Sequence, residues 1–284
     1  MNRNRNNPLR PRIGLALGGG GAKGLAHIGV LKALDESQIP IDFIAGTSVG
    51  ALIGGAYASG VTVDQMIRLA LRTRWRDLGR LTLSKLGFRD SATIEEFVRQ
   101  YFPVSTFEEA KLPFAAVAAD ICTGEPEIIQ KGDLARAIRA SCAVPGYFTP
   151  MVSDRGRMLV DGGIVLNLPT SVVRRMGADR VIGVDVYPSA ARDKAPTNAY
   201  QIYVQSIAIV ASRSGRSARA DADLLVIPQV AGVAWDEIER APELIGAGEE
   251  AMLRSLDTCR KWLAERDRPK GLFKRLFSWR SVLK

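Results

Sequence analysis

The feature that most constrains the fold is a short apolar run, residues 13–17 (IGLAL), that stops at four consecutive glycines. A short apolar run that ends at glycines is typical of a buried strand entering a tight turn. Residues 22–35 then place apolar side chains at helical spacing. We therefore expect the chain to begin with a strand, a tight turn and a helix.

The same alternation of strand and helix continues along the chain. Short apolar runs predict further strands at residues 41–45, 114–119, 126–130, 157–160, 180–186 and 223–227. Helical spacing predicts helices at residues 48–59, from 63 onwards, 91–101, 132–142, 169–176, within 199–222 and within 240–265. Thr93 and Glu96 have the spacing of a capping box, and the Arg-rich residues 73–90 give no assignment. This alternation predicts an α/β fold with a mostly parallel central sheet flanked by helices.

The net charge of +9 is concentrated at the two ends of the chain. Residues 1–12 carry +4 and residues 266–284 carry +6, which leaves −1 for residues 13–265. A nucleic-acid-binding domain normally carries its basic patch on the folded body, so we expect no nucleic acid partner. We expect a single domain over residues 13–265, between a solvated basic N-terminal tail and a basic C-terminal tail.

The C-terminal tail combines basic and apolar residues. Residues 271–284 read GLFKRLFSWRSVLK, with most of the apolar side chains on one broad side of a helix. Such a helix fits an anionic membrane surface, and we expect peripheral membrane contact there. A terminal helix packed on the domain fits the pattern equally well.

Cysteine and histidine usage limits the kinds of site that are available. Cys122, Cys142 and Cys259 form no CxxC pair, and the chain has a single histidine. We therefore expect neither a disulfide framework nor a Cys/His zinc site, and we expect a reducing compartment. The sequence shows no apolar run long enough for a transmembrane helix and no secretory signal pattern. We predict a cytoplasmic location, with contact at the inner face of the membrane through the tail.

Residues 46–50 read Gly-Thr-Ser-Val-Gly and follow the strand predicted at 41–45. A nucleophile on a sharp strand-to-helix turn needs a strained backbone, and Gly46 and Gly50 let neighbouring segments pass close to it. The N-terminus of the next helix favours negative charge that develops beside Ser48. The pattern also fits a glycine-rich turn whose serine only caps the helix.

Residues 18–24 (GGGGAKG) contain G-x-G-x-x-G between a strand and a helix, which is also the fingerprint of dinucleotide-binding proteins. That fingerprint requires an acidic residue at a strand end, whereas Asp42 opens its predicted strand. The amides of consecutive glycines can instead form an oxyanion hole, in which one donor contributes about 3 kcal/mol of transition-state stabilisation. The loop alone does not decide between these uses, and we expect Lys23 to face solvent.

The residues Asp161-Gly162-Gly163 close the strand predicted at 157–160. A carboxylate that acts as a base must lie within hydrogen-bond reach of the serine hydroxyl. Two glycines after it let the chain turn away without crowding a substrate, although Asp-Gly is also a common turn. Asp120 and Asp185 also follow apolar strands, but neither has the two glycines, and we expect both to be structural.

The only histidine, His27, restricts the mechanisms that Ser48 can use. It lies three residues after the glycine loop, on the next helix, where we expect it to pack against the loop. Without a histidine, the base for Ser48 is a carboxylate, and burial must raise its pKa to make it effective near neutral pH.

These motifs occur in an order and at separations that resemble the bacterial patatin-like phospholipases. The resemblance covers about residues 12–230 and rests on the segments GGGGAKG at 18–24, AHIGVLKAL at 26–34, GTSVG at 46–50, ADICTG at 119–124, ASCAVPGYFTP at 140–150 and DGG at 161–163.

The resemblance implies a three-layer patatin-like domain that hydrolyses acyl esters of lipids with no metal or organic cofactor. It implies a catalytic dyad of Ser48 and Asp161, with acyl transfer through the serine. It also implies an oxyanion hole built from the backbone of Gly19, Gly20 and Gly21. The glycines that complete these motifs are Gly24, Gly46, Gly50, Gly162 and Gly163.

Three alternatives stay open at this point. An acyltransferase or thioesterase would use the same dyad and differ only in the acyl donor or acceptor. A dinucleotide-binding protein would use residues 18–24 but leaves GTSVG and DGG unexplained. A non-catalytic regulatory protein on the same fold is the third alternative, and the intact motifs count against it.

Overall fold

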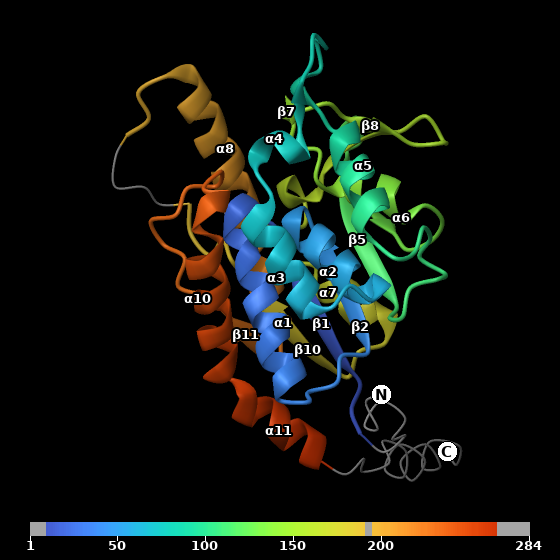
Figure 1. The fold of residues 1–284 in the computed structure, drawn as a ribbon, viewed down its shortest axis with the longest axis vertical. Coiled ribbons are helices and arrows are strands. Elements are labelled where there is room, and N and C mark those ends of the chain that lie inside the picture. Colours follow the sequence, from blue (N-terminus) through green and yellow to red (C-terminus); the bar gives the residue numbers. More distant parts are fainter. Residues whose placement is uncertain (1–9, 191–194, 266–284) are drawn as a thin grey trace, which may run out of the picture.

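The computed structural model describes residues 10–190 and 195–265, and its centre is an eight-stranded sheet (Figure 1). Its strands are β1 (Ile13–Leu17), β2 (Phe43–Thr47), β5 (Phe114–Asp120), β6 (Pro126–Ile129), β8 (Met151–Val152), β9 (Met158–Asp161), β10 (Arg180–Val184) and β11 (Leu224–Val226). The order is β11-β10-β1-β2-β5-β9-β8, with β6 also paired to β5. The strands from β11 to β5 are parallel, whereas β6 and β9 run antiparallel to β5. The predicted α/β fold with a mostly parallel sheet is confirmed.

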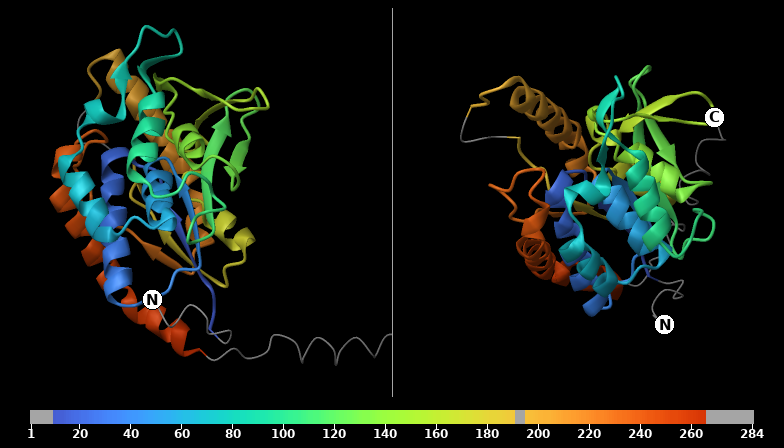
Figure 2. Two further views of the ribbon diagram at one scale, coloured as in Figure 1. Left: turned by 45° about the vertical axis from the view of Figure 1, so that its right-hand side comes forward. Right: turned by 45° about the horizontal axis from the view of Figure 1, so that its top comes forward.

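Helices cover both faces of this sheet (Figures 1 and 2). They are α1 (Ala26–Glu36), α2 (Val49–Ser59), α3 (Val63–Arg72), α4 (Trp75–Leu78), α5 (Ala92–Tyr101), α6 (Leu134–Ser141), α7 (Thr170–Met176), α8 (Ala199–Ser214), α9 (Arg216–Ala220), α10 (Ala241–Leu253) and α11 (Leu256–Ala264). Because strand side chains alternate between faces, Leu15 of β1 packs in the core that contains α1 and α2, and Ala16 packs in the core that contains α7. No helix among the described residues is both long and apolar enough to cross a membrane.

A second, three-stranded sheet occupies the region that the sequence left unassigned. It consists of β3 (Arg80–Leu81), β4 (Gly87–Asp90) and β7 (Gly146–Phe148), in the order β3-β4-β7. The β3–β4 hairpin projects from the upper end of the molecule in Figure 1. Its strands are short, and β3 is exposed while β4 is mostly half-buried, so they lack the buried apolar runs by which the other strands were predicted.

The predicted capping box at the start of α5 is wrong. The helix begins at Ala92, and Thr93 lies within its first turn, beyond the capping position. The Thr93 hydroxyl donates to the backbone carbonyls of Leu78 (2.9 Å) and Asp90 (2.8 Å), so it joins α5 to the segment that precedes it.

The expectation of a wholly solvated N-terminal tail also needs correction. Arg10 is buried, and its guanidinium donates to both carboxylate oxygens of Asp42, at 2.6 and 2.7 Å. Asp42 also accepts from the Ile13 amide at 2.7 Å, which ties the chain to the amino ends of β1 and β2. Asp42 therefore lies at the end of the sheet opposite to the glycine loop, where it does not serve a dinucleotide. Residues 1–9 and the predicted tail at 266–284 lie outside the described residues.

Helices α1 and α10 pack with their backbones in contact through two glycines. A Cβ added to Gly29 would lie 1.9 Å from the Ile245 carbonyl oxygen, and one added to Gly248 would lie 1.8 Å from the Ala26 carbonyl oxygen. Neither position has room for a methyl group. Since α1 begins beside the glycine loop, this contact also fixes the helix that follows the loop.

This packing predicts opposite effects for two glycine substitutions on the same helix. Gly248→Ala should lower the free energy of unfolding by about 1–3 kcal/mol, because the methyl group overlaps α1. Gly246 has no atom within 4 Å of an added Cβ. Gly246→Ala should therefore raise stability by up to about 1 kcal/mol, through helix propensity alone. Urea denaturation measures both, and equal effects of the two variants would contradict the close contact.

Candidate active site

Ser48 lies on a sharp turn between β2 and α2, in a conformation that residues other than glycine rarely adopt. Its backbone angles are φ 56° and ψ −128°. The flanking glycines allow this turn, because a Cβ on Gly46 would lie 2.2 Å from the Gly50 carbonyl oxygen, and one on Gly50 would lie 2.2 Å from that of Leu17. Such strain persists only where the surroundings hold it, and it is concentrated at functional sites.

The Ser48 turn is held by a second serine that the sequence analysis did not single out. The Ser48 amide donates to the Ser141 hydroxyl at 2.9 Å, and that hydroxyl donates to the Val117 carbonyl at 2.6 Å. Ser141 is fully buried at the end of α6. One hydroxyl therefore links the Ser48 turn, α6 and the central strand β5. The segment ASCAVPGYFTP contains Ser141, but a hydrogen bond of this kind leaves no periodic signal.

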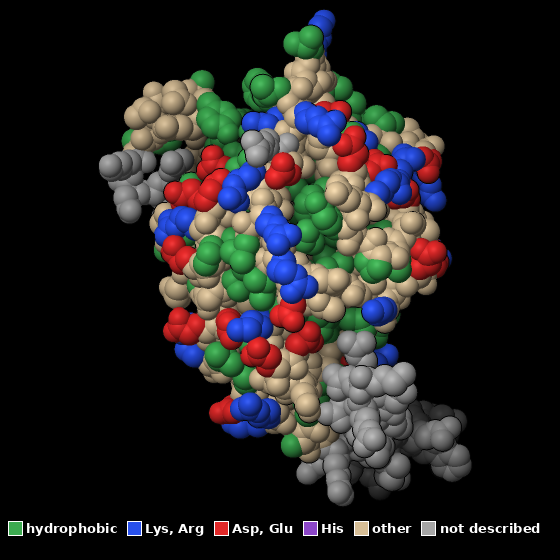
Figure 3. Space-filling view, viewed as in Figure 1, with side chains coloured by type: hydrophobic (Ala, Val, Ile, Leu, Met, Phe, Trp, Pro, Cys, Tyr) green, Lys and Arg blue, Asp and Glu red, His purple; other side chains and the backbone are tan. Residues whose placement is uncertain are grey.

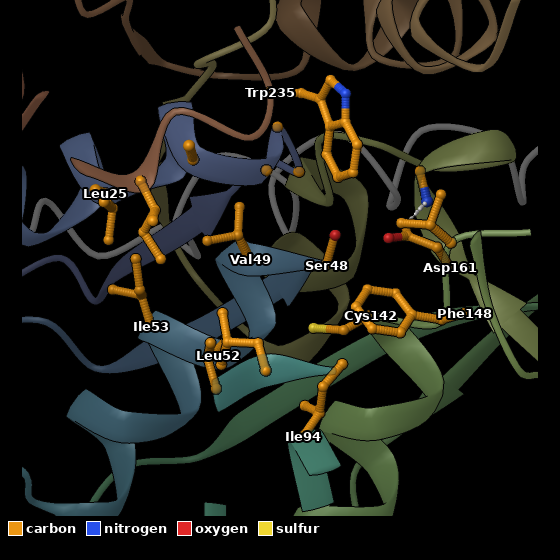
Figure 4. A pocket seen from close by; sticks show the side chains of 18 of the residues that line it. Leu25, Ser48, Val49, Leu52, Ile53, Ile94, Cys142, Phe148, Asp161 and Trp235 are labelled. Carbon is orange, nitrogen blue, oxygen red and sulfur yellow. Dashed lines mark hydrogen bonds between the residues drawn. The ribbon is translucent and has the colours of Figure 1, made fainter. Parts of the chain in front are cut away.

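Asp161 ends β9 on the other side of β5 from Ser48. Thr47 pairs with Val117, and Asp161 pairs with the next residue along β5, Ala118. The two strands therefore deliver Ser48 and Asp161 to the same place, and in Figure 4 the Ser48 hydroxyl and the Asp161 carboxylate point toward each other. The structure thus brings together the two residues that the sequence predicted to act as a pair.

The environment of Asp161 changes its acidity. The side chain is buried, and this burial raises the pKa of its carboxyl to about 6, although hydrogen bonds from the Ser48 hydroxyl and the Gly163 amide act in the opposite direction. The hydrogen bond from the Gly163 amide to one Asp161 carboxylate oxygen is 2.8 Å long and holds that oxygen in place. A carboxylate with such a pKa is ionised at neutral pH but binds a proton far more readily than an exposed aspartate.

The two rival carboxylates have other contacts. Asp120 accepts from the Cys122 amide at 2.9 Å and closes the turn after β5. Asp185 forms a 2.5 Å ion pair with Arg219 and accepts from the Tyr187 amide at 2.9 Å. Both are therefore structural, as predicted.

The glycine loop lies directly against Ser48. A Cβ added to Gly19 would lie 3.1 Å from the Ser48 Cβ. The Gly19 amide already donates to the Asn167 carbonyl at 3.2 Å, whereas the amides of Gly20 and Gly21 have no acceptor among the described residues. Of the three glycines that the resemblance assigns to an oxyanion hole, Gly20 and Gly21 thus keep amides without an acceptor in the described part of the chain.

Asn167 was not recognised from the sequence, although it follows the Asp-Gly-Gly motif closely. Its carbonyl accepts from the Gly19 amide, and its side-chain amide donates to the Gly19 carbonyl at 3.3 Å. Asn167 thereby fixes Gly19 from both sides. An asparagine six residues after Asp161 is the signal that could have identified it.

His27 and Lys23 support the same loop. The His27 Nε2 donates to the Gly18 carbonyl at 2.7 Å, and full burial lowers the pKa of the ring to about 4. His27 is thus a neutral structural residue, as predicted, and it is not among the residues that line the cavity. Lys23 differs from the prediction, because it is half-buried with its ammonium 4.4 Å from the centre of the Tyr187 ring.

A cavity of about 230 Å³ opens beside Ser48 and Asp161. Its walls are mainly apolar and come from α2, α3, α5 and α8, together with Trp235 and Tyr147 (Figure 4). Cys142 lines it beside Asp161, and burial raises the pKa of this thiol well above its usual value, so it remains neutral. No cluster of three or more metal-binding side chains occurs in the described part of the chain.

The fold and the site together define an α/β protein in which a serine elbow, a facing carboxylate and a glycine loop line an apolar cavity. The chain belongs to the patatin-like phospholipase family, whose model matches residues 15–174. The matched segment contains the glycine loop, Ser48 and Asp161, and it ends before α8.

Known relatives share this part of the chain. An uncharacterized NTE family protein of Mycobacterium bovis, Mb1092c, is 40% identical over 192 residues, which are 66% of this chain and 53% of that protein. Lysophospholipase NTE1 of Mycosarcoma maydis is 40% identical over 180 residues, 61% of this chain and 10% of that protein. The chain thus spans about half or less of these relatives. The crystal structure of VipD from Legionella pneumophila shares the fold, with a TM-score of 0.51 and 15% identity over 88% of this chain and 67% of that one.

The raised pKa of Asp161 can be measured without any assay of activity. In protein labelled with ¹³C at aspartate carboxyls, one buried carboxyl should titrate at about 6 and should disappear in Asp161→Asn. Ser48→Ala removes a hydrogen bond to the charged form and should raise this pKa further. A carboxyl that titrates near the usual value of about 4 in both proteins would contradict the predicted environment.

Proposed function

We propose that this protein hydrolyses acyl ester bonds of lipids, in the manner of a phospholipase A or lysophospholipase, through a Ser48–Asp161 dyad. The observation that supports the proposal most directly is the Ser48 hydroxyl facing a buried carboxylate in the wall of an apolar cavity. Family membership supports the same reaction class.

The reaction would proceed in two steps through an acyl-serine intermediate. Asp161 accepts the Ser48 proton while the serine oxygen attacks the ester carbonyl, and the protonated Asp161 then gives that proton to the departing alcohol. Asp161 then takes a proton from water as the water oxygen attacks the acyl-serine, and it gives this proton to the departing Ser48 oxygen as a fatty acid is released. The amides of Gly20 and Gly21 would bind the oxyanion in both steps, and the helix dipole of α2 would favour its charge.

The lipid character of the proposed substrate follows from the cavity walls. Leu52 and Ile53 of α2, Met66 of α3 and Ile94 of α5 present hydrocarbon surface next to Ser48. An acyl chain buried there would gain about 0.8 kcal/mol for each methylene group removed from water. The lysophospholipase names of several relatives agree with such a substrate.

Labelling with a fluorophosphonate probe tests the nucleophile and its base. Wild-type protein should label at a single serine, and Ser48→Ala should lose the label. Asp161→Asn should react roughly 10³-fold more slowly or not at all, because it cannot accept the proton. Asp120→Asn is the matched control and should label at the wild-type rate. Equal labelling of Ser48→Ala and wild type would refute the assignment, and an unreactive wild type would favour a non-catalytic protein.

The pH dependence of kcat/KM should show an acid limb at about 6, because Asp161 must be ionised to act as base. Activity should therefore be present above pH 6 and fall as the pH decreases through this value. His27→Gln should keep the limb at the same pH, since the ring is already neutral there. Loss of the limb in folded His27→Gln would instead assign the base to histidine.

Product analysis separates hydrolysis from the alternative of acyl transfer. With a phospholipid substrate in buffer, we expect free fatty acid and lysophospholipid in equal amounts. If added alcohol or thiol acceptors capture most of the acyl groups at low concentration, the protein is an acyltransferase.

The predicted membrane contact through residues 271–284 and the cytoplasmic location stay predictions. Deleting residues 268–284 and measuring liposome co-sedimentation tests the tail, and unchanged binding would contradict its role.

A further inference from the structure

The β3–β4 hairpin exposes an unusual set of large apolar side chains. Leu83 is fully exposed, and Leu81, Phe88 and Leu86 are 80%, 64% and 56% exposed. Surface leucines and phenylalanines normally occur singly, so four within eight residues indicate a contact with something other than water. In Figure 3 the tip of this hairpin carries hydrophobic and basic side chains at the upper end of the molecule.

Helix α8 presents a second apolar surface at the same end. Ile202 and Ile209 lie seven residues apart on its outer side and are 56% and 40% exposed, while Val204 and Ala208 on the other side line the cavity. The helix is therefore apolar on both sides, in a position where a globular protein would normally place polar residues. Figures 1 and 2 show α8 and the hairpin projecting from the same end of the molecule.

An aromatic cluster in the cavity wall is linked to the hairpin. Trp75 and Trp235 lie with ring centres 5.2 Å apart, and Tyr147 lies 5.0 Å from Trp235. All three rings are half-buried and line the cavity beside Ser48. Tyr147 belongs to β7, which pairs with β4 of the hairpin. Half-buried tryptophan and tyrosine rings are characteristic of protein surfaces at a membrane interface.

The charge of these segments matches an anionic surface. Residues 80–90 carry Arg80, Lys85 and Arg89 against Asp90, although Arg80 also pairs with Glu96 at 3.5 Å, and α8 contains no acidic residue. Basic side chains next to exposed leucine and phenylalanine are the combination that binds the headgroup region of anionic bilayers.

We propose that the β3–β4 hairpin and the outer side of α8 form a surface that docks on an anionic lipid bilayer, with the mouth of the cavity facing the membrane. This inference rests on the proposed function, since it explains how a lipid passes from the bilayer to Ser48. It differs from a contact through the C-terminal tail, because α11, which precedes that tail, lies at the opposite end of the molecule (Figures 1 and 2).

Vesicle co-sedimentation tests the docking surface independently of catalysis. Full-length Ser48→Ala protein should bind vesicles of equimolar phosphatidylcholine and phosphatidylglycerol, and should bind pure phosphatidylcholine vesicles more weakly. Adding Leu83→Asp and Leu86→Asp should lower the partition coefficient roughly tenfold or more. The two leucine side chains would no longer insert into the bilayer, and the aspartates would be repelled by the anionic headgroups. The matched control is Leu253→Asp, a leucine 50% exposed at the end of α10, which should change binding less than about twofold.

A second assay separates the two proposals. It measures hydrolysis of a water-soluble short-chain ester by protein that keeps Ser48 and carries the same leucine substitutions. Leu83→Asp/Leu86→Asp should retain this activity within about twofold, because neither side chain lines the cavity. Absence of hydrolysis with intact vesicle binding would overturn the proposed function but not the docking surface. Three outcomes would overturn the docking proposal. The hairpin variant could bind vesicles as well as its parent, Leu253→Asp could lose as much vesicle binding as the hairpin variant, or the protein could self-associate through the hairpin and not bind vesicles.

Discussion

The strained turn at Ser48 is the feature on which the rest of the site depends. A residue with a side chain in this conformation costs about 1–3 kcal/mol, and the fold must supply that energy from its surroundings. It does so through the Ser141 hydroxyl, which bonds the turn to β5, and through glycines that let β1 and α2 touch the turn directly. The glycine loop, the facing carboxylate and the cavity all lie around this one turn.

Burial determines the roles of the ionisable groups near the turn. Asp161 is desolvated enough for its pKa to rise, yet it keeps two hydrogen bonds that favour its charge, so it remains ionised at neutral pH. His27 is desolvated without a carboxylate partner, so its ring stays neutral and serves as a donor to the Gly18 carbonyl. The same physical effect therefore produces a candidate base in one case and a structural residue in the other.

The sequence predicted the parts of the structure that local patterns specify. Buried apolar runs identified the central strands, and the motif glycines identified close approaches such as that of Gly50 to β1. Ser141 and Asn167 were missed because their bonds join segments far apart in the chain and follow no period. The hairpin was missed because its apolar residues point into solvent, whereas strand prediction relies on burial. The half-buried position of Lys23 depends on Tyr187, which is distant in the sequence.

The position of β5 between β2 and β9 has a consequence for how the protein folds. Neighbouring strands are about 4.8 Å apart, so Ser48 and Asp161 are held at a fixed separation by two strand pairings, one parallel and one antiparallel. Both pairings join segments that are far apart along the chain, and such contacts slow folding because closing the intervening loops costs conformational entropy. Ser48 and Asp161 therefore come together only when β2 and β9 have both paired with β5, so the geometry of the site depends on the centre of the sheet being formed.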